Sequence, residues 1–160
     1  MIDLRDVASV RARRPLLIAH RGGVVADEAP ECSLAAIEEA ARRGYAMVEL
    51  DVRRSSDGVA VVFHDGRLRP ACDRAGSVAD YPAAKLVEFV YEGTDERIFT
   101  LDTALGRCHA LGLGVMLDLK AGRDDGAFLD AINRSIENNG LSSATVSFSG
   151  SAERVSDSLT

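Results

Sequence analysis

The sequence predicts an α/β protein, either a (β/α) barrel or a doubly wound sheet. Short apolar runs that are typical of buried strands alternate with segments whose apolar residues recur at helical spacing. Charged residues gather where several of these strands end, and both folds bind ligands at the carboxyl ends of their strands. No G-x-G-x-x-G or Walker loop follows a strand, which counts against a nucleotide-binding fold.

Length and composition narrow the class of protein. A chain of 160 residues that is 46% hydrophobic is long enough for one core, so we expect a single domain over residues 1–160. The net charge of -6 and the pI near 5.1 exclude a general nucleic-acid-binding surface, which needs a basic footprint. Three cysteines without C-x-x-C spacing predict buried thiols in a reducing compartment: Cys32, Cys72 and Cys108.

The N-terminal residues carry charges throughout and contain no apolar signal segment. No apolar run approaches the roughly 18 residues of a transmembrane helix. We therefore expect a cytoplasmic protein without stable membrane insertion, in which residues 1–14 form a short helix or arm.

The first predicted strand, residues 16–19, ends at His20 and Arg21, which two glycines follow. Because glycine lets the backbone approach a bound group closely, this strand end predicts a ligand-facing loop. Residues 33–43 have helical spacing, and a glycine ends them. With the next strand, over residues 47–53, they predict a βαβ unit that contains a parallel strand pair.

Glu49 and Asp51 stand two positions apart on this second strand, so their side chains share one face. They lie about 7 Å apart along the backbone, where two carboxylates repel each other unless a cation lies between them. A divalent metal ion is the cation that this pattern predicts. The alternative is an edge strand whose acidic face is solvated.

A turn at residues 55–58 leads to the next predicted strand, residues 59–63, which ends at His64. The turn is too short for a parallel return, so we expect a hairpin that brings this histidine back toward the acidic strand. Residues 66–99 form the least regular part of the chain. They predict a long functional loop with a weak helix over residues 83–90.

The rest of the chain repeats the pattern of helix and strand. Thr100 predicts the N-cap of a helix through residue 111, whose His109 we expect in packing or at the surface. Asp118 and Lys120 share one face of the strand over residues 115–120. The remaining predicted elements are a helix with Phe128, Ile132 and Ile136 on its apolar face, a strand over residues 143–148 and a helix over residues 152–159.

The predicted strand ends together carry the histidines, carboxylates and cations that metal-assisted phosphodiester cleavage requires: His20, Arg21, Glu49, Asp51, His64, Asp65, Asp118 and Lys120. A divalent ion binds carboxylate oxygens and a phosphoryl oxygen and offsets the charge of the transition state. One histidine can accept the proton of the nucleophile while the other protonates the leaving alkoxide. Arginine and lysine can hold the remaining phosphate oxygens.

The order and spacing of these segments resemble the glycerophosphodiester phosphodiesterase family, within the phospholipase C-like phosphodiesterase barrels. The matching segments lie between residues 16 and 120 and include Ile18-Ala19-His20-Arg21-Gly22-Gly23, Pro30-Glu31-Cys32-Ser33-Leu34, Val48-Glu49-Leu50-Asp51-Val52, Val61-Val62-Phe63-His64-Asp65 and Leu117-Asp118-Leu119-Lys120. This resemblance implies a TIM-type barrel, of which about the first five strands are present.

The resemblance also implies a small-molecule substrate and a reaction, the hydrolysis of a glycerophosphodiester to glycerol 3-phosphate and an alcohol. The residues that it implies are His20 and His64 as acid and base, Glu49, Asp51 and Asp118 as ligands of Mg²⁺ or Ca²⁺, and Arg21, Glu31 and Lys120 as the lining of the phosphate site. Two alternatives stay open: which histidine is the acid, and whether water or a glycerol hydroxyl attacks first.

A second hypothesis is a catalytically impaired, truncated relative that binds phosphate or metal, or that oligomerises. A (β/α)8 barrel needs about 250 residues, so five strands indicate an unfinished barrel. Its exposed strand edges favour a homo-oligomer. Asp118 also stands where the family commonly has the longer Glu. A third hypothesis, head-group release like that of sphingomyelinase D, is disfavoured because nothing in the sequence indicates secretion or disulfides.

Overall fold

The structure, a computed structural model, describes residues 1–23, 29–69, 71–120 and 126–149. Its sheet consists of β1 (Ile18–Ala19), β2 (Met47–Arg54), β3 (Ala60–Val62), β4 (Phe99–Thr100), β5 (Gly114–Leu119) and β6 (Thr145–Phe148). The helices are α1 (Val7–Arg11), α2 (Leu34–Arg42), α3 (Ala83–Leu86), α4 (Leu101–Leu111) and α5 (Gly126–Asn138), with two short 3-10 helices, η1 (His20–Gly22) and η2 (Val78–Asp80).

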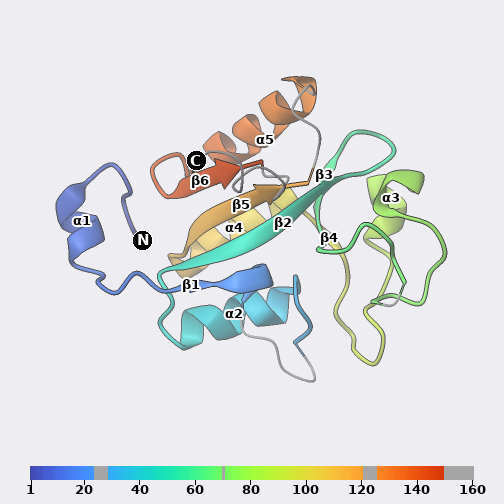
Figure 1. Cartoon of the computed structure of the whole chain (residues 1–160), viewed down its shortest axis with the longest axis horizontal. Helices are drawn as coiled ribbons and strands as arrows, with labels where there is room; N and C mark the ends of the chain where they lie inside the picture. Colours follow the sequence, from blue (N-terminus) through green and yellow to red (C-terminus); the bar gives the residue numbers. More distant parts are fainter. Residues whose placement is uncertain (24–28, 70, 121–125, 150–160) are drawn as a thin grey trace, which may run out of the picture.

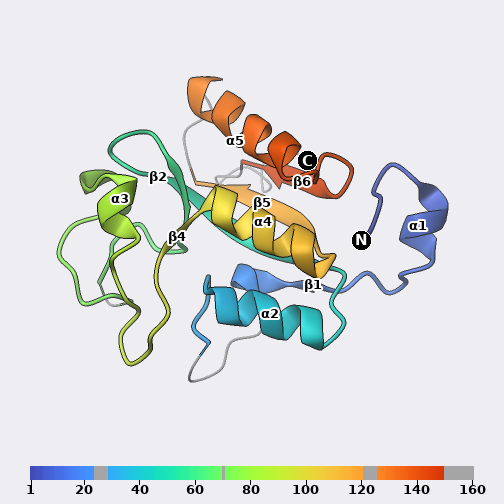
Figure 2. The ribbon, with the colours of Figure 1, turned by 180° about the vertical axis from the view of Figure 1, so that it is seen from behind.

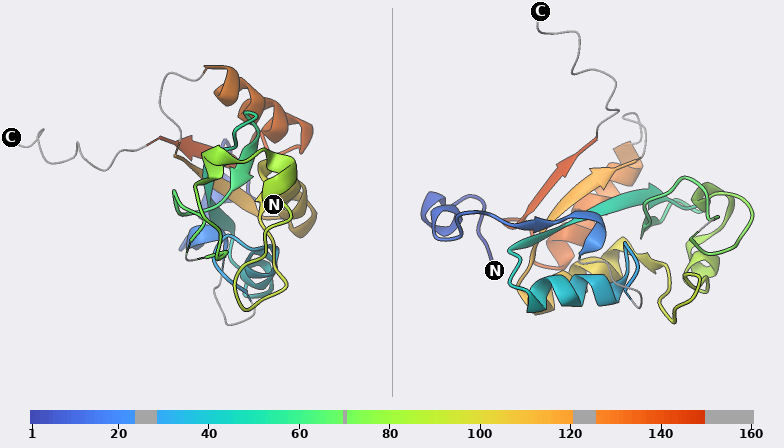
Figure 3. Two further views of the ribbon diagram at one scale, coloured as in Figure 1. Left: turned by 90° about the vertical axis from the view of Figure 1, so that its right-hand side faces the viewer. Right: turned by 60° about the horizontal axis from the view of Figure 1, so that its bottom comes forward.

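Four parallel strands lie side by side in chain order, as β1, β2, β5 and β6 (Figure 3). Doubly wound sheets reverse their strand order at a switch point, whereas consecutive order is that of a (β/α) barrel. The described strands therefore form the first part of a barrel and leave an open sheet, as the sequence predicts. Because β2 has neighbours on both sides, the alternative of a solvated edge strand is wrong.

The third strand returns antiparallel to the second, with Val62 of β3 opposite Val52 of β2. This hairpin confirms the predicted short link and brings the chain back to the carboxyl end of β2. β4, which the sequence does not predict, pairs antiparallel with β3 through Phe99 and Val62. A strand of two residues is too short to show a periodic pattern in the sequence.

Three helices form one layer against the sheet. α4 packs against both α2 and α5 and lies between them (Figure 2). Val48, Leu50 and Val52 of β2 are fully buried in the core that also holds Ile37 of α2 and Leu105 of α4. Since strand side chains alternate between faces, Glu49 and Asp51 point to the other face of the sheet.

α2 and α4 begin and end where the sequence predicts. The Ser33 hydroxyl accepts a hydrogen bond from the Ala36 N–H at the start of α2, and Thr100 does the same for Thr103 at the start of α4. Such N-caps satisfy backbone donors that the first helical turn leaves unpaired. Gly112 ends α4 in the left-handed conformation.

The segment over residues 64–98 lies beyond the carboxyl end of β2 (Figure 1). It is more ordered than a long loop, because it contains η2 and α3 and packs around its own hydrophobic cluster, which includes Phe63, Leu86 and Phe89. The predicted helix over residues 83–90 is shorter in the structure. It ends at Leu86, because the chain is already extended at Phe89, whose backbone oxygen accepts a hydrogen bond from the Ile98 N–H.

All three cysteines are free and buried, as predicted, and His109 is exposed on α4. The N-terminal arm contains the short helix α1, which Asp6 caps. None of the helices in the described part of the chain has the length and apolar character needed to span a bilayer. The helix predicted over residues 152–159 lies outside the described residues.

Candidate active site

Three carboxylates meet at the carboxyl ends of β2 and β5. Asp51 and Asp118 stand opposite each other in the strand register, and Glu49 stands two positions before Asp51. One oxygen from each residue lies within 4.8 Å of the other two. We call Glu49, Asp51 and Asp118 the acidic trio. Glu49 and Asp51 are buried, so their charges need compensation within the protein or from a bound ion.

Lys120 supplies part of this compensation. Its ammonium lies 2.9 Å from Asp51 Oδ1 and 2.5 Å from Asp118 Oδ2. Burial lowers the pKa of Lys120, but the hydrogen bonds to Asp118 and Asp51 outweigh burial and raise it overall. Burial also raises the pKa of Glu49. The backbone N–H of Arg21, which donates to this carboxylate, lowers the pKa but by less than burial raises it.

The acidic trio fits a hard divalent cation. Asp118 Oδ1 is buried and has no hydrogen-bond partner among the described residues, so it is an acceptor that a cation can use. Carboxylate oxygens are the ligands that Mg²⁺ and Ca²⁺ prefer. Lys120 bonds to one oxygen each of Asp51 and Asp118, and Glu49 adds a third carboxylate within reach.

The short helix η1 holds His20 and Arg21 beside the acidic trio. Arg21 has φ 54° and ψ 47°, a left-handed conformation that costs energy for any residue with a side chain. In this conformation its N–H donates to Glu49 Oε2 at 2.8 Å. His20 Nε2 lies 3.8 Å from the same oxygen, and the imidazole is 76% exposed, so it is open to a substrate.

A second group of side chains links these residues to His64. Arg21 Nη1 donates to Glu31 Oε2 at 2.8 Å, and this bond raises the pKa of Arg21. Glu31 Oε1 lies 3.7 Å from His64 Nδ1, and Asp65 Oδ1 lies 2.9 Å from the same nitrogen. The structure therefore brings all eight predicted site residues to one end of the sheet.

The structure adds two contacts that the sequence does not predict. Cys32 Sγ lies 3.7 Å from Asp51 Oδ2, and burial raises the pKa of this thiol well above its ordinary value, so it stays protonated and donates. Arg53 Nε and Nη2 donate to the backbone oxygen of His64 at 3.0 and 2.6 Å. The alternation of β2 places Arg53 on the face of Glu49 and Asp51, and this signal could have identified it.

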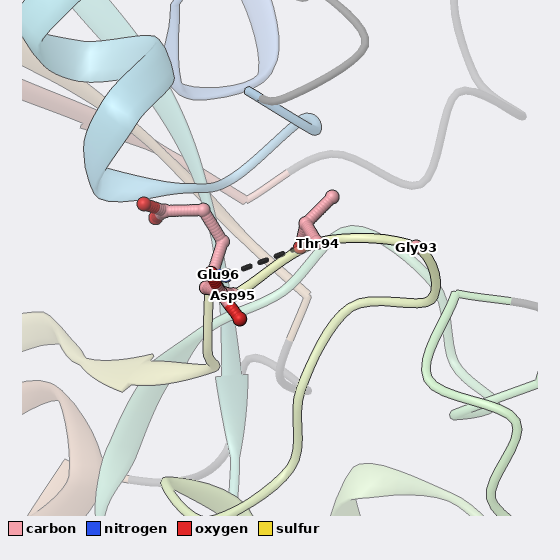
Figure 4. A pocket seen from close by; sticks show the side chains of 4 residues that line it. All are labelled: Gly93, Thr94, Asp95 and Glu96. Atoms are coloured by element: carbon pink, nitrogen blue, oxygen red, sulfur yellow. Dashed lines mark hydrogen bonds between the residues drawn. The ribbon is translucent and has the colours of Figure 1, made fainter.

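A cavity of about 560 Å³ lies against residues 93–96, and none of these is a predicted site residue. Figure 4 shows the Glu96 side chain extending from this loop toward the start of α2. Its carboxylate accepts hydrogen bonds from the N–H groups of Leu34 and Ala35 at 3.1 and 3.4 Å. Glu96 therefore caps the helix that follows Glu31 and Cys32, and we assign it a structural role.

Comparison with known proteins identifies relatives of this chain. The sequence profile of the Glycerophosphoryl diester phosphodiesterase family matches residues 20–131. Glycerophosphodiester phosphodiesterase 1 from Rattus norvegicus is 40% identical over 116 residues, which are 67% of this chain and 34% of that protein. The protein of the same name from Homo sapiens is 38% identical over 112 residues, covering 64% of this chain and 33% of that protein.

Solved structures share the fold. A glycerophosphodiester phosphodiesterase from Agrobacterium tumefaciens superposes with a TM-score of 0.71 at 29% identity, over 86% of this chain and 58% of that one. A phosphodiesterase from Oleispira antarctica, solved with the product sn-glycerol-3-phosphate, superposes with a TM-score of 0.70 at 31% identity, over 81% of this chain and 55% of that one.

The chain spans about a third of the length of the two curated relatives and little more than half of each solved structure. The matched part nevertheless contains every predicted site residue, from His20 to Lys120. The profile match over residues 20–131 and the shared barrel fold show that the chain belongs to the glycerophosphodiester phosphodiesterase family.

Proposed function

We propose that this chain hydrolyses glycerophosphodiesters to glycerol 3-phosphate and an alcohol in a metal-dependent reaction. The observation that carries the proposal is the placement of two imidazoles at the same end of the sheet as the acidic trio: His20 lies 3.8 Å from Glu49, and His64 is linked to Arg21 through Glu31. Membership of the family supports it, as does the product bound in the Oleispira antarctica relative. The acidic trio would hold Mg²⁺ or Ca²⁺, which when bound supplies charge for the phosphoryl oxygens in the transition state.

The cationic side chains bind and orient the phosphodiester. Arg21 Nε has no hydrogen-bond partner among the described residues, and the side chain is 36% exposed, so the guanidinium has N–H capacity left for a phosphoryl oxygen. Lys120, which bonds to Asp51 and Asp118, adds a positive charge beside the trio that attracts the phosphodiester anion. Glu31 fixes the Arg21 side chain through its salt bridge and so shapes the phosphate site.

His20 and His64 move the protons of the reaction. One of them accepts the proton of the attacking group, either water or a glycerol hydroxyl, and the other donates a proton to the departing alkoxide, so that neither oxygen carries a full charge. Asp65 bonds to His64 Nδ1 and leaves Nε2 to face the reacting group. These two roles require one bound phosphate to reach both imidazoles. The contacts of His20 with Glu49 and of His64 with Glu31 are compatible with this requirement.

The test is the release of glycerol 3-phosphate from glycerophosphocholine by the full chain, with Mg²⁺ or Ca²⁺ and with excess chelator. We expect metal-dependent turnover that falls by about a hundredfold or more in His20→Ala and in His64→Ala. His109→Ala is the matched control, because this histidine is exposed on α4 and has no place in the site. Turnover that survives the chelator contradicts the proposal, whereas metal binding without turnover favours the non-catalytic alternative.

A further inference from the structure

A second, smaller cavity lies next to the acidic trio and differs from it in charge. Its volume is about 150 Å³, and its lining consists of Arg53, Arg54, Gly66, Lys120 and residues 77–79. Three of these residues are cations, and none of the described lining residues is a carboxylate. A concave site with several cations and no acid is suited to an anion.

Arg53 presents a donor to this cavity. Its Nε and Nη2 already bind the His64 oxygen, which holds the guanidinium in one orientation. Nη1 makes no hydrogen bond to a described residue and lies beside Gly66, where a Cβ would be 3.8 Å away. Arg53 and Gly66 both line the cavity, so this nitrogen is the guanidinium donor that a bound anion can use.

Lys120 joins the cavity to the proposed metal site. Its ammonium has three N–H groups, of which two are directed at Asp51 and Asp118. The third is left for a ligand on the cavity side. Arg54 also lines the cavity, but its guanidinium lies over the Phe128 ring, 5.9 Å from the ring centre, so we assign the binding itself to Arg53 and Lys120.

We propose that this cavity, the Arg53 pocket, binds a second anionic group of the substrate, a phosphate monoester on the alcohol half of the phosphodiester. The proposal rests on the proposed function, because it places the phosphodiester itself at the acidic trio. Since Lys120 lines the pocket and contacts the trio, a ligand can occupy both with only a few bonds between its two phosphates. The fork of Arg53 and the point charge of Lys120 are the usual partners of such a group.

The test compares two ligands that differ by one phosphate, glycerophosphoinositol 4-phosphate and glycerophosphoinositol. Their affinities are measured by calorimetry with Ca²⁺ in the His20→Ala protein, so that neither ligand is consumed. We expect the phosphorylated ligand to bind about tenfold or more tightly, as for a charge-assisted contact. We expect Arg53→Gln to bring this ratio close to one.

A second variant tests the pocket without touching either cation. Ala79 is exposed and lines the pocket, so Ala79→Glu places a negative charge there and is expected to remove most of the preference for the phosphorylated ligand. Ala110→Glu is the matched control. Ala110 is exposed near the end of α4, just before β5 begins, at the opposite end of the sheet from Lys120, and the ratio is expected to stay unchanged.

Equal affinities of the two ligands overturn the Arg53 pocket, and so does a preference that persists in both Arg53→Gln and Ala79→Glu. If neither ligand binds, the proposed pocket is also overturned. Turnover of glycerophosphocholine by the unaltered chain separates this outcome from failure of the proposed function. If that turnover is present while the affinities are equal, the pocket is wrong and the hydrolase stands.

Discussion

Asp51 and Asp118 face each other across two parallel strands, and Lys120 Nζ lies between one oxygen of each. Because two acids held this close repel each other, the stability of the carboxyl end of the sheet depends strongly on bound positive charge. Addition of Mg²⁺ or Ca²⁺ is therefore expected to stabilise the folded chain. When the metal concentration is about a hundredfold above the dissociation constant, binding should raise the free energy of unfolding by roughly 2.7 kcal/mol, and chelator should remove this gain.

The measurement is the midpoint of thermal unfolding with metal and with chelator. Asp118→Asn is expected to reduce the metal-dependent rise, because it removes the charge of one of the three proposed ligands. Asp130→Asn, an exposed position on α5, makes the same change away from the site and should keep the full rise. A metal-insensitive midpoint in the unaltered chain contradicts the site.

Asp65 is expected to act as a positioning residue. Its carboxylate accepts the Nδ1 proton of His64, and an Asn at this position can present an amide donor that favours the other tautomer. We expect Asp65→Asn to lower kcat by about tenfold or more without changing the unfolding midpoint. Asp73→Asn, on the exposed surface of the same segment, is the control for the change in charge. An unchanged pH profile and kcat would show that the His64 ring is held by other contacts.

Gly23 and Gly44 offer a matched pair of glycine substitutions. A Cβ at Gly23 would lie 1.9 Å from the backbone oxygen of Ala36, whereas a Cβ at Gly44 would meet nothing within 4 Å. Gly23→Ala therefore forces η1 away from α2, while Gly44→Ala costs only about 1 kcal/mol for its left-handed conformation. We expect insoluble or strongly destabilised protein for the first and a small loss of stability for the second. Denaturant unfolding of both variants measures the difference, and equal losses contradict the close packing at Gly23.

Glu96 caps α2 from a position 62 residues further along the chain. Removing its carboxylate leaves two N–H groups at the start of the helix without their acceptor, which we expect to cost about 1 kcal/mol of unfolding free energy. Glu96→Ala is compared with Glu92→Ala, an exposed glutamate of the same loop. A cost that is the same in both variants would assign the effect to the loop and not to the cap.

Glu39 is expected to make acid stability depend on pH. Hydrogen bonds from Arg42 and Arg43 lower its pKa from 4.5 to about 2. Because the folded state has the lower pKa, the stabilisation is complete above the ordinary value of 4.5 and is lost as the pH falls toward 2. The difference in melting temperature between the unaltered chain and Glu39→Gln should therefore be largest near neutral pH and shrink in acid. A difference that stays constant from pH 7 to pH 3 contradicts this assignment.

Local sequence patterns predicted most of the described strands and the arrangement of residues at the centre of the candidate site. The two-residue alternation of β2 predicted that Glu49 and Asp51 share a face, because this periodicity follows from strand geometry alone. The hairpin that returns His64 followed from a link too short for a parallel crossover. The caps Ser33 and Thr100 were predictable because a capping side chain contacts residues only three positions ahead.

Contacts between distant segments were not predictable from these patterns. Cys32 and Asp51 meet only because η1 and α2 are folded against β2. Glu96 contacts the first residue of α2, Leu34, although the two residues are 62 positions apart in the chain. The hydrophobic cluster of residues 61–98 has no regular period, since it is built from short turns. The length of α3 depends on the pairing of Phe89 with Ile98, which the helical spacing over residues 83–90 does not reveal.

Among the described residues, the buried apolar side chains fall into two separate clusters, one beneath the parallel sheet and one within residues 61–98. Hydrogen exchange should therefore reveal two cooperative units, with the amides of the smaller unit exchanging through partial opening at lower free energy. His64 and Asp65 lie within the segment that forms the smaller unit, whereas the acidic trio belongs to the larger one. On mild heating the chain should thus release one imidazole first, while the carboxylates remain assembled on a sheet that has not yet melted.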